Sequence, residues 1–235
     1  MKFKNIIKGI FFPQRCEICG KLRPLNMPYC ESCGIDSNTI STSACPDCGH
    51  EKCMCRSGAN VHLPHFTAVY YYQGQIKSSL LSFKFSGDSV YGEIFGKAMA
   101  NRITELYDSI EFDGICFVPM TDKAERIRGY NQSELLASKI SSELNIPLLP
   151  CLRKTRDSQA QKSLNSAERY KNIKDSFVAK TDYQIKGKTL ILCDDIKTTG
   201  STLRECCDIL MKAGAKDVYC VCLALTPYLK YTDLF

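Results

Sequence analysis

A parallel, doubly wound α/β sheet that follows a small cysteine-rich domain is the fold that this 235-residue sequence predicts. From residue 66 to residue 225, short apolar runs typical of buried strands alternate with longer segments whose apolar residues recur at helical spacing. This alternation favours parallel strands connected by helices. In the first part of the chain, by contrast, eight of the fifteen cysteines fall between Cys16 and Cys55. We therefore expect two domains, residues 1–60 and residues 61–235.

The chain begins with a segment, residues 1–12, in which three lysines lie among large apolar residues, and this pattern predicts an amphipathic helix. The apolar run is too broken for a secretory signal, and no small-residue cleavage site follows it. We expect the helix to pack on its own protein, with binding to a membrane surface as the alternative. The sequence contains no run of eighteen apolar residues, so we expect no membrane span and a cytoplasmic protein.

Two cysteine pairs near the N-terminus have the spacing of a metal site. Cys16 and Cys19 form one Cys-x-x-Cys knuckle, and Cys30 and Cys33 form another after ten intervening residues. Each knuckle is followed by a glycine that relaxes its tight turn. Four thiolates in a tetrahedron make a closed structural zinc site. We therefore expect one zinc ion here.

A third knuckle, Cys45-x-x-Cys48, is followed closely by the shorter pair Cys53-x-Cys55. Together they predict a second zinc site, with His50 as an alternative ligand or an exposed turn residue. Spacing alone also leaves open a pairing of the first knuckle with the third. A site closed by four thiolates does no chemistry, and its default role is to fold a segment too small for a core of its own.

The formal net charge of +6 overstates how basic the folded protein would be. With two zinc ions held by eight thiolates, the net charge becomes about +2. Global charge is therefore a weak argument for nucleic-acid binding. The segment from Arg153 to Lys174 is a better one, because it holds seven basic residues against two acidic ones. It lacks periodicity and is long enough to be a functional loop.

The rest of the chain divides into alternating elements. We expect strands at 66–72, 114–119, 147–152, 176–179, 189–193 and 218–225, and helices at 76–85, 91–107, 133–144 and 203–213. Ligands of such sheets bind at the carboxyl ends of the strands. This rule puts Pro119, Asp194 and Asp195 on the same rim.

The strand at 189–193 leads into the most informative stretch of the sequence. Asp194 and Asp195 come first, and a short hydroxyl-rich loop then opens a helix. The free N–H groups and dipole at a helix N-terminus favour an anion such as phosphate, and Gly200 allows a close backbone approach. Carboxylates repel phosphate, so the two aspartates suit sugar hydroxyls or a Mg²⁺ ion that bridges sugar and diphosphate. Side-chain donors come from Thr198, Thr199, Ser201 and Thr202.

The run from Leu190 to Thr202 resembles the phosphoribosyl-diphosphate (PRPP) loop of type I phosphoribosyltransferases. That motif is four apolar residues, two acids, one apolar residue, any residue, and Thr-Thr-Gly-x-Thr. Every position matches, with Lys197 in the free position. The resemblance implies a sheet of the type I phosphoribosyltransferase type, in which Asp194 and Asp195 bind the ribose hydroxyls and residues 198–202 hold the 5′-phosphate.

The order of motifs along the chain resembles the ComF family, also called ComFC-like or competence protein F. After the knuckles come Arg128-Gly129-Tyr130-Asn131-Gln132 behind a Val-Pro turn, and then the PRPP-type loop. The resemblance covers nearly the whole chain and departs from the family in the compressed Cys53/Cys55 pair. Further positions that fall in the family's order are Lys84 in a Phe-Lys-Phe run, Gln159 or Gln161, Arg169, Asn172 and Phe177.

This resemblance implies an N-terminal double zinc ribbon joined to a phosphoribosyltransferase-like domain, and a part in natural transformation. A diphosphate leaving group needs cationic donors or Mg²⁺. We expect Lys84 and Arg126 to bind the ligand, and Arg128 to act with Asp194 and Asp195 in catalysis. For Asn131 and Gln132, ligand contact and capping of the next helix remain equally open.

Two functions follow from these observations. The first is a PRPP-binding protein that handles incoming single-stranded DNA with competence proteins, using the basic segment and the aromatic run Tyr70–Tyr72. The alternative is an active phosphoribosyltransferase that acts on a small nitrogenous acceptor. The sequence names neither the acceptor nor the oligomeric state.

Overall fold

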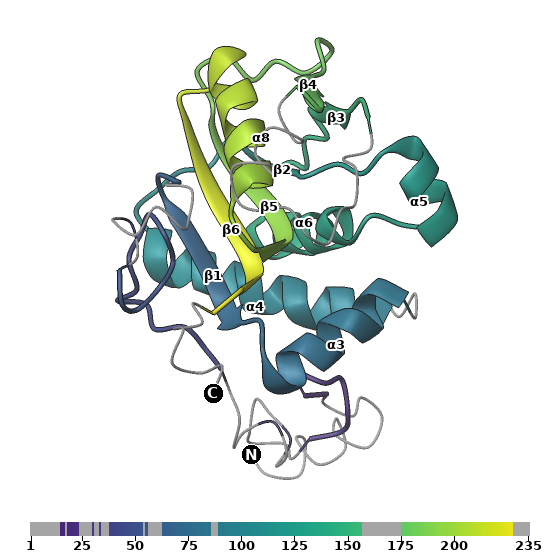
Figure 1. Cartoon of the computed structure of the whole chain (residues 1–235). Helices are drawn as coiled ribbons and strands as arrows, with labels where there is room; N and C mark the ends of the chain where they lie inside the picture. The colour runs from purple at the N-terminus through teal and green to yellow at the C-terminus, as the bar shows by residue number, and fades with distance from the viewer. Residues whose placement is uncertain are drawn as a thin grey trace.

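The computed structural model describes residues 15–16, 18–23, 30, 33, 38–53, 55, 63–85, 89–156 and 175–227. A four-stranded sheet with the order β1-β6-β5-β2 forms its centre, and all three strand pairs are parallel (Figure 1). The parallel α/β sheet that the sequence predicts is therefore confirmed. Its strands are β1 (Phe66–Tyr71), β2 (Gly114–Phe117), β5 (Thr189–Lys197) and β6 (Asp217–Leu225).

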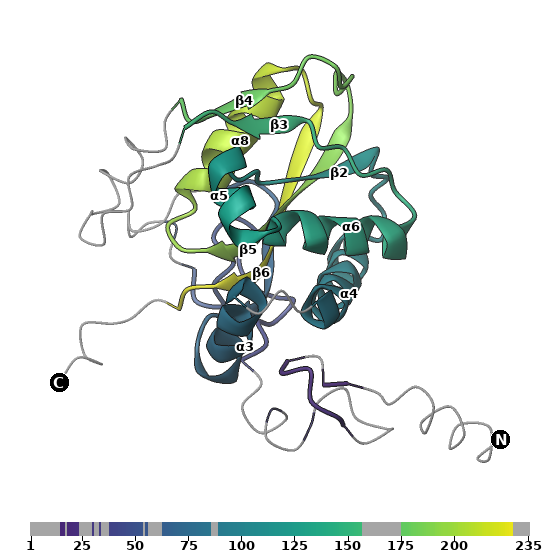
Figure 2. The ribbon, with the colours of Figure 1, turned by 90° about the vertical axis from the view of Figure 1, so that its right-hand side faces the viewer.

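Helices cover both faces of this sheet, as a doubly wound fold requires (Figures 1 and 2). Along β5, Ile191 packs in the core with α4 and α6, whereas Leu190 and Leu192 pack in the core with α8. This alternation follows from the two-residue period of a strand. The described helices are α3 (Gly74–Phe85), α4 (Ser89–Tyr107), α5 (Asp122–Arg128), α6 (Gln132–Leu144) and α8 (Ser201–Lys212).

The cysteines outside the knuckles are core residues, as their apolar surroundings in the sequence predict. All seven are at most 4% exposed. Most of them lie in the core layer on the α8 side of the sheet, where the small thiol fills gaps between larger side chains. The seven are Cys116, Cys151, Cys193, Cys206, Cys207, Cys220 and Cys222.

The strand β5 is longer than the apolar run predicts. The pairing with β6 continues beyond Cys193 through Asp194 and Ile196 to Lys197, which lies opposite Leu225. Because β6 extends equally far, its backbone offers hydrogen-bond partners to residues whose side chains are polar. The two aspartates therefore belong to the strand itself.

The prediction of a strand at residues 147–152 is wrong. In its place a single parallel bridge joins Leu148 to Ile115, and β3 (Leu152–Lys154) pairs antiparallel with β4 (Phe177–Ala179) in a separate two-stranded sheet. Pro147 and Pro150 have no N–H group to donate, which explains why this segment does not add a full strand to the main sheet.

The segment that carries the third knuckle packs along the edge of β1. The N–H of Ile40 donates to Val69 O at 2.9 Å, and the N–H of Tyr71 donates to Asn38 O at 2.7 Å. The N–H of Phe66 donates to the carbonyl of Pro46, inside the knuckle, at 2.6 Å. These bonds cover an edge strand that would otherwise present unpaired backbone groups.

Two sequence expectations fall outside the described residues: the N-terminal helix, and the basic segment from residue 157 to residue 174. Of the aromatic run, Tyr70 is 1% exposed and belongs to the core, so it is not available to stack on a base. Among the helices that the structure describes, none is both long and apolar enough to cross a bilayer.

Candidate functional site: an acid pair beside a phosphate loop

Two carboxylates lie next to each other near the end of β5 and are held by different partners. Asp194 accepts hydrogen bonds from the Ser133 hydroxyl at 2.8 Å and from the N–H of Asp195 at 2.9 Å. Asp195 forms an ion pair with Lys84, with 2.8 Å between Nζ and Oδ2. Burial, reinforced by the neighbouring charge of Asp195, raises the pKa of Asp194 to about 7. The pair therefore changes its charge near neutral pH.

The partner of Asp194 is placed by the start of α6. Asn131 caps this helix, because its side chain accepts from the N–H of Ser133 at 3.0 Å and donates to Val118 O at 3.1 Å. The capping alternative is thus confirmed for Asn131. Gln132 is not the cap: its Oε1 accepts from Arg128 at 2.7 Å, and its buried Nε2 has no partner among the described residues.

The partner of Asp195 is placed by the end of α3. Lys84 lies in the last turn of that helix, and the hydroxyl of Tyr130 donates to the carbonyl of the preceding residue, Phe83. Tyr130 and Asn131 belong to the same short motif, so this motif helps to fix a partner on each side of the acid pair. This use of the motif is structural: it anchors backbone and helix ends around the two carboxylates.

Three residues, Thr198–Gly200, connect β5 to α8; together with Ser201 and Thr202 of the first helical turn, we call them the phosphate loop. Gly200 adopts a φ of 86°, in the left-handed region that costs little only for glycine, and it occupies the N-cap position of α8. The N-cap glycine has no side chain to cap the helix. Apart from a long bond from Ser201 N–H to the Thr199 hydroxyl, at 3.4 Å, the first-turn N–H groups keep their capacity to bind an anion. The hydroxyls of Thr199 and Ser201 lie 3.0 Å apart. A hollow of about 60 Å³ is lined by Asp194 and residues 196–203.

The two arginines of the predicted site lie on α5, a helix with no buried residues. Arg126 donates to the Asp122 carbonyl of its own helix, and Arg128 donates to Gln132 at the start of α6. The structure therefore brings Lys84, the aspartates and the phosphate loop together, while the recorded bonds of the two arginines go to α5, to Met120 just before it and to the start of α6. Both arginines are exposed.

The sequence reasoning missed two residues at this site. Ser133, whose hydroxyl donates to Asp194, could have been found from the sequence as the residue whose N–H an Asn131 cap would bind. Lys197 occupies the free position of the PRPP motif, and its side chain is only 1% exposed. The signal available in the sequence was a lysine that follows closely after an apolar strand.

The eight knuckle cysteines form two groups of four, and within each group the sulfur atoms lie within 4.8 Å of one another. The first cluster is Cys16, Cys19, Cys30 and Cys33, and the second cluster is Cys45, Cys48, Cys53 and Cys55. Four converging thiols fit a tetrahedral zinc ion, so each cluster can hold zinc.

This grouping settles the pairing that spacing alone left open: the first knuckle joins the second, and the third joins the Cys53/Cys55 pair. His50 is neither a member of the second cluster nor an exposed turn residue, since it is 4% exposed and its ring lies 6.1 Å from that of Tyr71.

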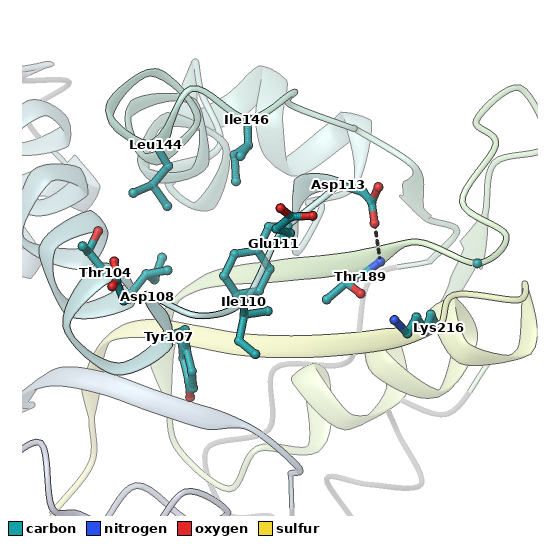
Figure 3. Close-up of a pocket in the computed structure, with 13 residues that line it drawn as sticks. Thr104, Tyr107, Asp108, Ile110, Glu111, Asp113, Leu144, Ile146, Thr189 and Lys216 are labelled. Atoms are coloured by element: carbon teal, nitrogen blue, oxygen red, sulfur yellow. Dashed lines mark hydrogen bonds between the residues drawn. The ribbon is translucent and has the colours of Figure 1, made fainter.

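A larger hollow, about 600 Å³, lies at the opposite end of the sheet (Figure 3). It is lined by Asp108, Glu111, Asp113 and Lys216, among others, and the Asp113 carboxylate accepts from the N–H of Thr189 at 2.8 Å. Thr189 begins β5, so this hollow faces the amino ends of the strands. Parallel sheets bind ligands at the other end, and the acid pair therefore remains the candidate site.

The chain is similar to several known proteins. The family model of the phosphoribosyl transferase domain matches residues 131–232. The DNA utilization protein YhgH of Escherichia coli (strain K12) is 27% identical over 230 residues, which cover 91% of this chain and 98% of that protein. The competence protein ComFC of Streptococcus pneumoniae is also 27% identical, over 87% of this chain and 96% of its own length.

Among solved structures, the glutamine PRPP amidotransferase from B. subtilis, complexed with ADP and GMP, is 22% identical with a TM-score of 0.38. The match covers 56% of this chain and 25% of that one.

Proposed function

The chain belongs to the ComF family, and on that premise we propose that it binds PRPP with Mg²⁺ and acts in the uptake or handling of single-stranded DNA during natural transformation. One observation supports PRPP as the ligand: an acid pair held by Ser133 and Lys84 closely precedes the N-terminus of α8. The relatives' names, which refer to DNA utilization and to competence, support the process. Free thiols and candidate zinc sites suit a reducing compartment, so a cytoplasmic location is part of the proposal.

The acid pair would hold the ribose. Ionised carboxylates accept hydrogen bonds from vicinal hydroxyls, and the Ser133 hydroxyl keeps Asp194 oriented for that contact. Mg²⁺ bound with PRPP would supply positive charge to the diphosphate. Lys84 would exchange its ion pair with Asp195 for the more highly charged diphosphate, since both groups lie at the same rim.

The phosphate loop would hold the 5′-phosphate. The first-turn N–H groups of α8 point out of the helix end, Gly200 removes a Cβ from the approach, and the hydroxyls of Thr199 and Ser201 lie beside it. Arg126 and Arg128 are exposed on α5 and would reach the diphosphate by side-chain rotation.

The second candidate function is an active phosphoribosyltransferase that transfers ribose 5-phosphate to a small nitrogenous acceptor. The complete acid pair and phosphate loop favour it, because a protein that only scaffolds DNA does not need both. In this case Arg128 would stabilise the leaving diphosphate.

Titration calorimetry of PRPP in the presence of Mg²⁺ tests the site, with Asp195→Asn as the variant and the exposed Asp182→Asn as the matched control. We expect Asp195→Asn to weaken PRPP binding about 100-fold or more, because it removes one ionised acceptor and the partner of Lys84. Asp182→Asn should bind like the parent protein. An unchanged affinity in Asp195→Asn would contradict the site assignment.

The same titration with single-stranded DNA present separates the two functions. A PRPP affinity that changes when DNA is added supports DNA handling coupled to the site. PRPP binding without any DNA effect favours the transferase, and the next step is then a screen of small amines and bases for release of diphosphate.

A further inference from the structure

Lys197 is a charged residue in an apolar place. It is the last residue of β5, and its side chain is 1% exposed. Its Nζ donates to the carbonyl of Cys48 at 3.3 Å and lies 4.9 Å from the centre of the Phe66 ring. A carbonyl and an aromatic face only partly replace the water that a buried ammonium loses. The group therefore requires negative charge nearby.

The second cluster is the source of negative charge that the structure places beside Lys197. Cys48 contributes both the carbonyl that accepts from Nζ and one of the four thiols of this cluster. Among the described residues, no carboxylate forms an ion pair with Lys197. Four thiolates around one Zn²⁺ carry a net charge of −2. The ammonium and the metal tetrathiolate thus complement each other.

We propose that Lys197 is a positioning residue, which couples the phosphate loop to the metal ion at the second cluster. Its ammonium neutralises the metal tetrathiolate and thereby fixes the end of β5, from which the loop starts at the next residue. The functional part of this inference rests on the proposed binding of PRPP by the phosphate loop.

The backbone provides a short route from the metal to the loop. The carbonyl of Lys197 accepts from the N–H of Thr226 at 3.0 Å, which ties the strand end to β6. On the other side, the knuckle is fixed to the sheet by the bond from Phe66 N–H to Pro46 O at 2.6 Å. Lys197 is therefore held by its main chain to the sheet and by its side chain to the knuckle.

Loss of the metal would leave this arrangement without its counter-charge. The four sulfur atoms would no longer be held together around one ion, and a buried ammonium without a fixed partner is strongly unfavourable. Lys197 relaxes most readily by turning toward solvent, which displaces the strand end and the adjacent Thr198. The first cluster has no recorded bond to Lys197 or to the phosphate loop among the described residues. Its four cysteines belong to the core layer that α3 and α4 share, and the Tyr91 hydroxyl of α4 donates to Cys19 O at 3.1 Å.

The test compares four full-length single variants and one double variant. Lys197→Met removes the charge and keeps the length of the side chain, and Lys197→Arg keeps the charge. Cys53→Ser removes the exposed ligand of the second cluster, and Cys16→Ser serves as the control in the first cluster. For each variant, the measurements are zinc per chain, affinity for PRPP with Mg²⁺, and amide hydrogen exchange of residues 198–202 relative to residues 114–117.

We expect Lys197→Met and Cys53→Ser each to weaken PRPP binding about tenfold or more and to speed exchange of the loop amides by a similar factor, with the β2 amides unchanged. Lys197→Arg should restore most of the affinity. The double variant Lys197→Met/Cys53→Ser should be no worse than Cys53→Ser alone, because both changes remove the same interaction. Cys16→Ser should lose one zinc ion and leave the loop unchanged.

The proposal is overturned if the loop amides of Cys53→Ser and Lys197→Met exchange at the rate of the parent protein, or if Cys16→Ser disturbs the loop as much as Cys53→Ser does. Hydrogen exchange needs no ligand, so it also separates this inference from the proposed function. If the parent protein does not bind PRPP but its loop responds to loss of the second metal, the coupling stands and the PRPP assignment fails.

Discussion

The two cysteine clusters have the same ligands but different surroundings. All four cysteines of the first cluster are buried, and the cluster adjoins the helix layer through Tyr91. In the second cluster Cys53 is exposed, and the knuckle is bonded to β1 and contacts the end of β5. The comparison teaches that the elements packed against a structural metal site, and not its ligands, decide whether the metal site can influence a functional site. The first cluster lies where it can stabilise the fold, and the second cluster lies where it can also position the phosphate loop.

The largest expected effect is on stability, and it should separate the clusters. Cys16 is fully buried, so Cys16→Ser leaves three buried thiols and a hydroxyl with a defective metal site. We expect it to lower the free energy of unfolding by about 3 kcal/mol or more. Cys53 is exposed and Cys45 and Cys55 are half-buried, so Cys53→Ser should cost about 1–2 kcal/mol, because water can solvate the thiols that the lost metal leaves behind. Thermal unfolding with parallel zinc analysis measures both.

In this experiment each variant must have lost one zinc ion for the comparison to be valid. Equal losses of stability in the two variants would contradict the distinction between a buried and a partly exposed cluster.

A pair of glycines gives the next effect in size. Gly20 and Gly49 each end a knuckle at positive φ, 70° and 80°, so replacement by alanine strains both by about 1 kcal/mol. A Cβ at Gly49 would lie 2.4 Å from the Phe66 ring, whereas at Gly20 the nearest atom is 3.7 Å away, on the Tyr91 ring. Gly49→Ala should therefore cost about 1–3 kcal/mol more than Gly20→Ala in chemical denaturation.

The same pair bears on the positioning role of the second cluster. Phe66 lies under the ammonium of Lys197, so displacement of its ring should also weaken PRPP binding in Gly49→Ala. Gly20→Ala should leave the affinity as it is. A loss of affinity in both variants would point to a general loosening of the protein.

The smallest effect is a dependence on pH that belongs to the acid pair and to neither cluster. The pKa of Asp194 is about 7 in the folded protein, against an ordinary value of 3.8. Between about pH 4 and pH 7 the unfolded chain has lost this proton and the folded protein keeps it, so stability falls as the pH rises through this window. Asp194→Asn removes the penalty and should gain on the order of 2 kcal/mol relative to the parent protein between pH 5 and pH 8.

Unfolding curves of Asp194→Asn and of the control Asp182→Asn at both pH values check this expectation. The zinc content should stay constant across the window, which separates the titration of the carboxylate from release of metal. A stability difference between parent and Asp194→Asn that does not change with pH would contradict the raised pKa.

Local sequence patterns were sufficient for much of this structure. The apolar runs located β1, β2 and β6, the period of 3.6 located α4 and α8, and the cysteine spacing identified the eight candidate metal ligands but not how they group. All of these signals come from residues close together in the chain. The short strand proposed across Pro147 and Pro150 failed because its prolines outweighed its apolar composition.

The parts that the sequence did not reveal depend on long-range contacts. Lys197 meets Cys48 across 149 positions, and Ser133 meets Asp194 across 61. No periodicity links such residues, so the function of either one becomes visible only when the sheet brings them together. The extension of β5 through the acid pair has the same origin, because it depends on the length of its neighbour β6.

The seven buried cysteines of the sheet domain make the protein its own chemical reporter. Each is at most 4% exposed, so an alkylating reagent can reach these thiols only when the domain opens. The eight knuckle thiols become reactive at an earlier stage, when their metal is released. Pulsed alkylation followed by intact-mass analysis would therefore resolve two populations, one modified at up to eight sites and one at up to fifteen. Their ratio over time would follow metal loss and global unfolding separately, in a single unlabelled sample.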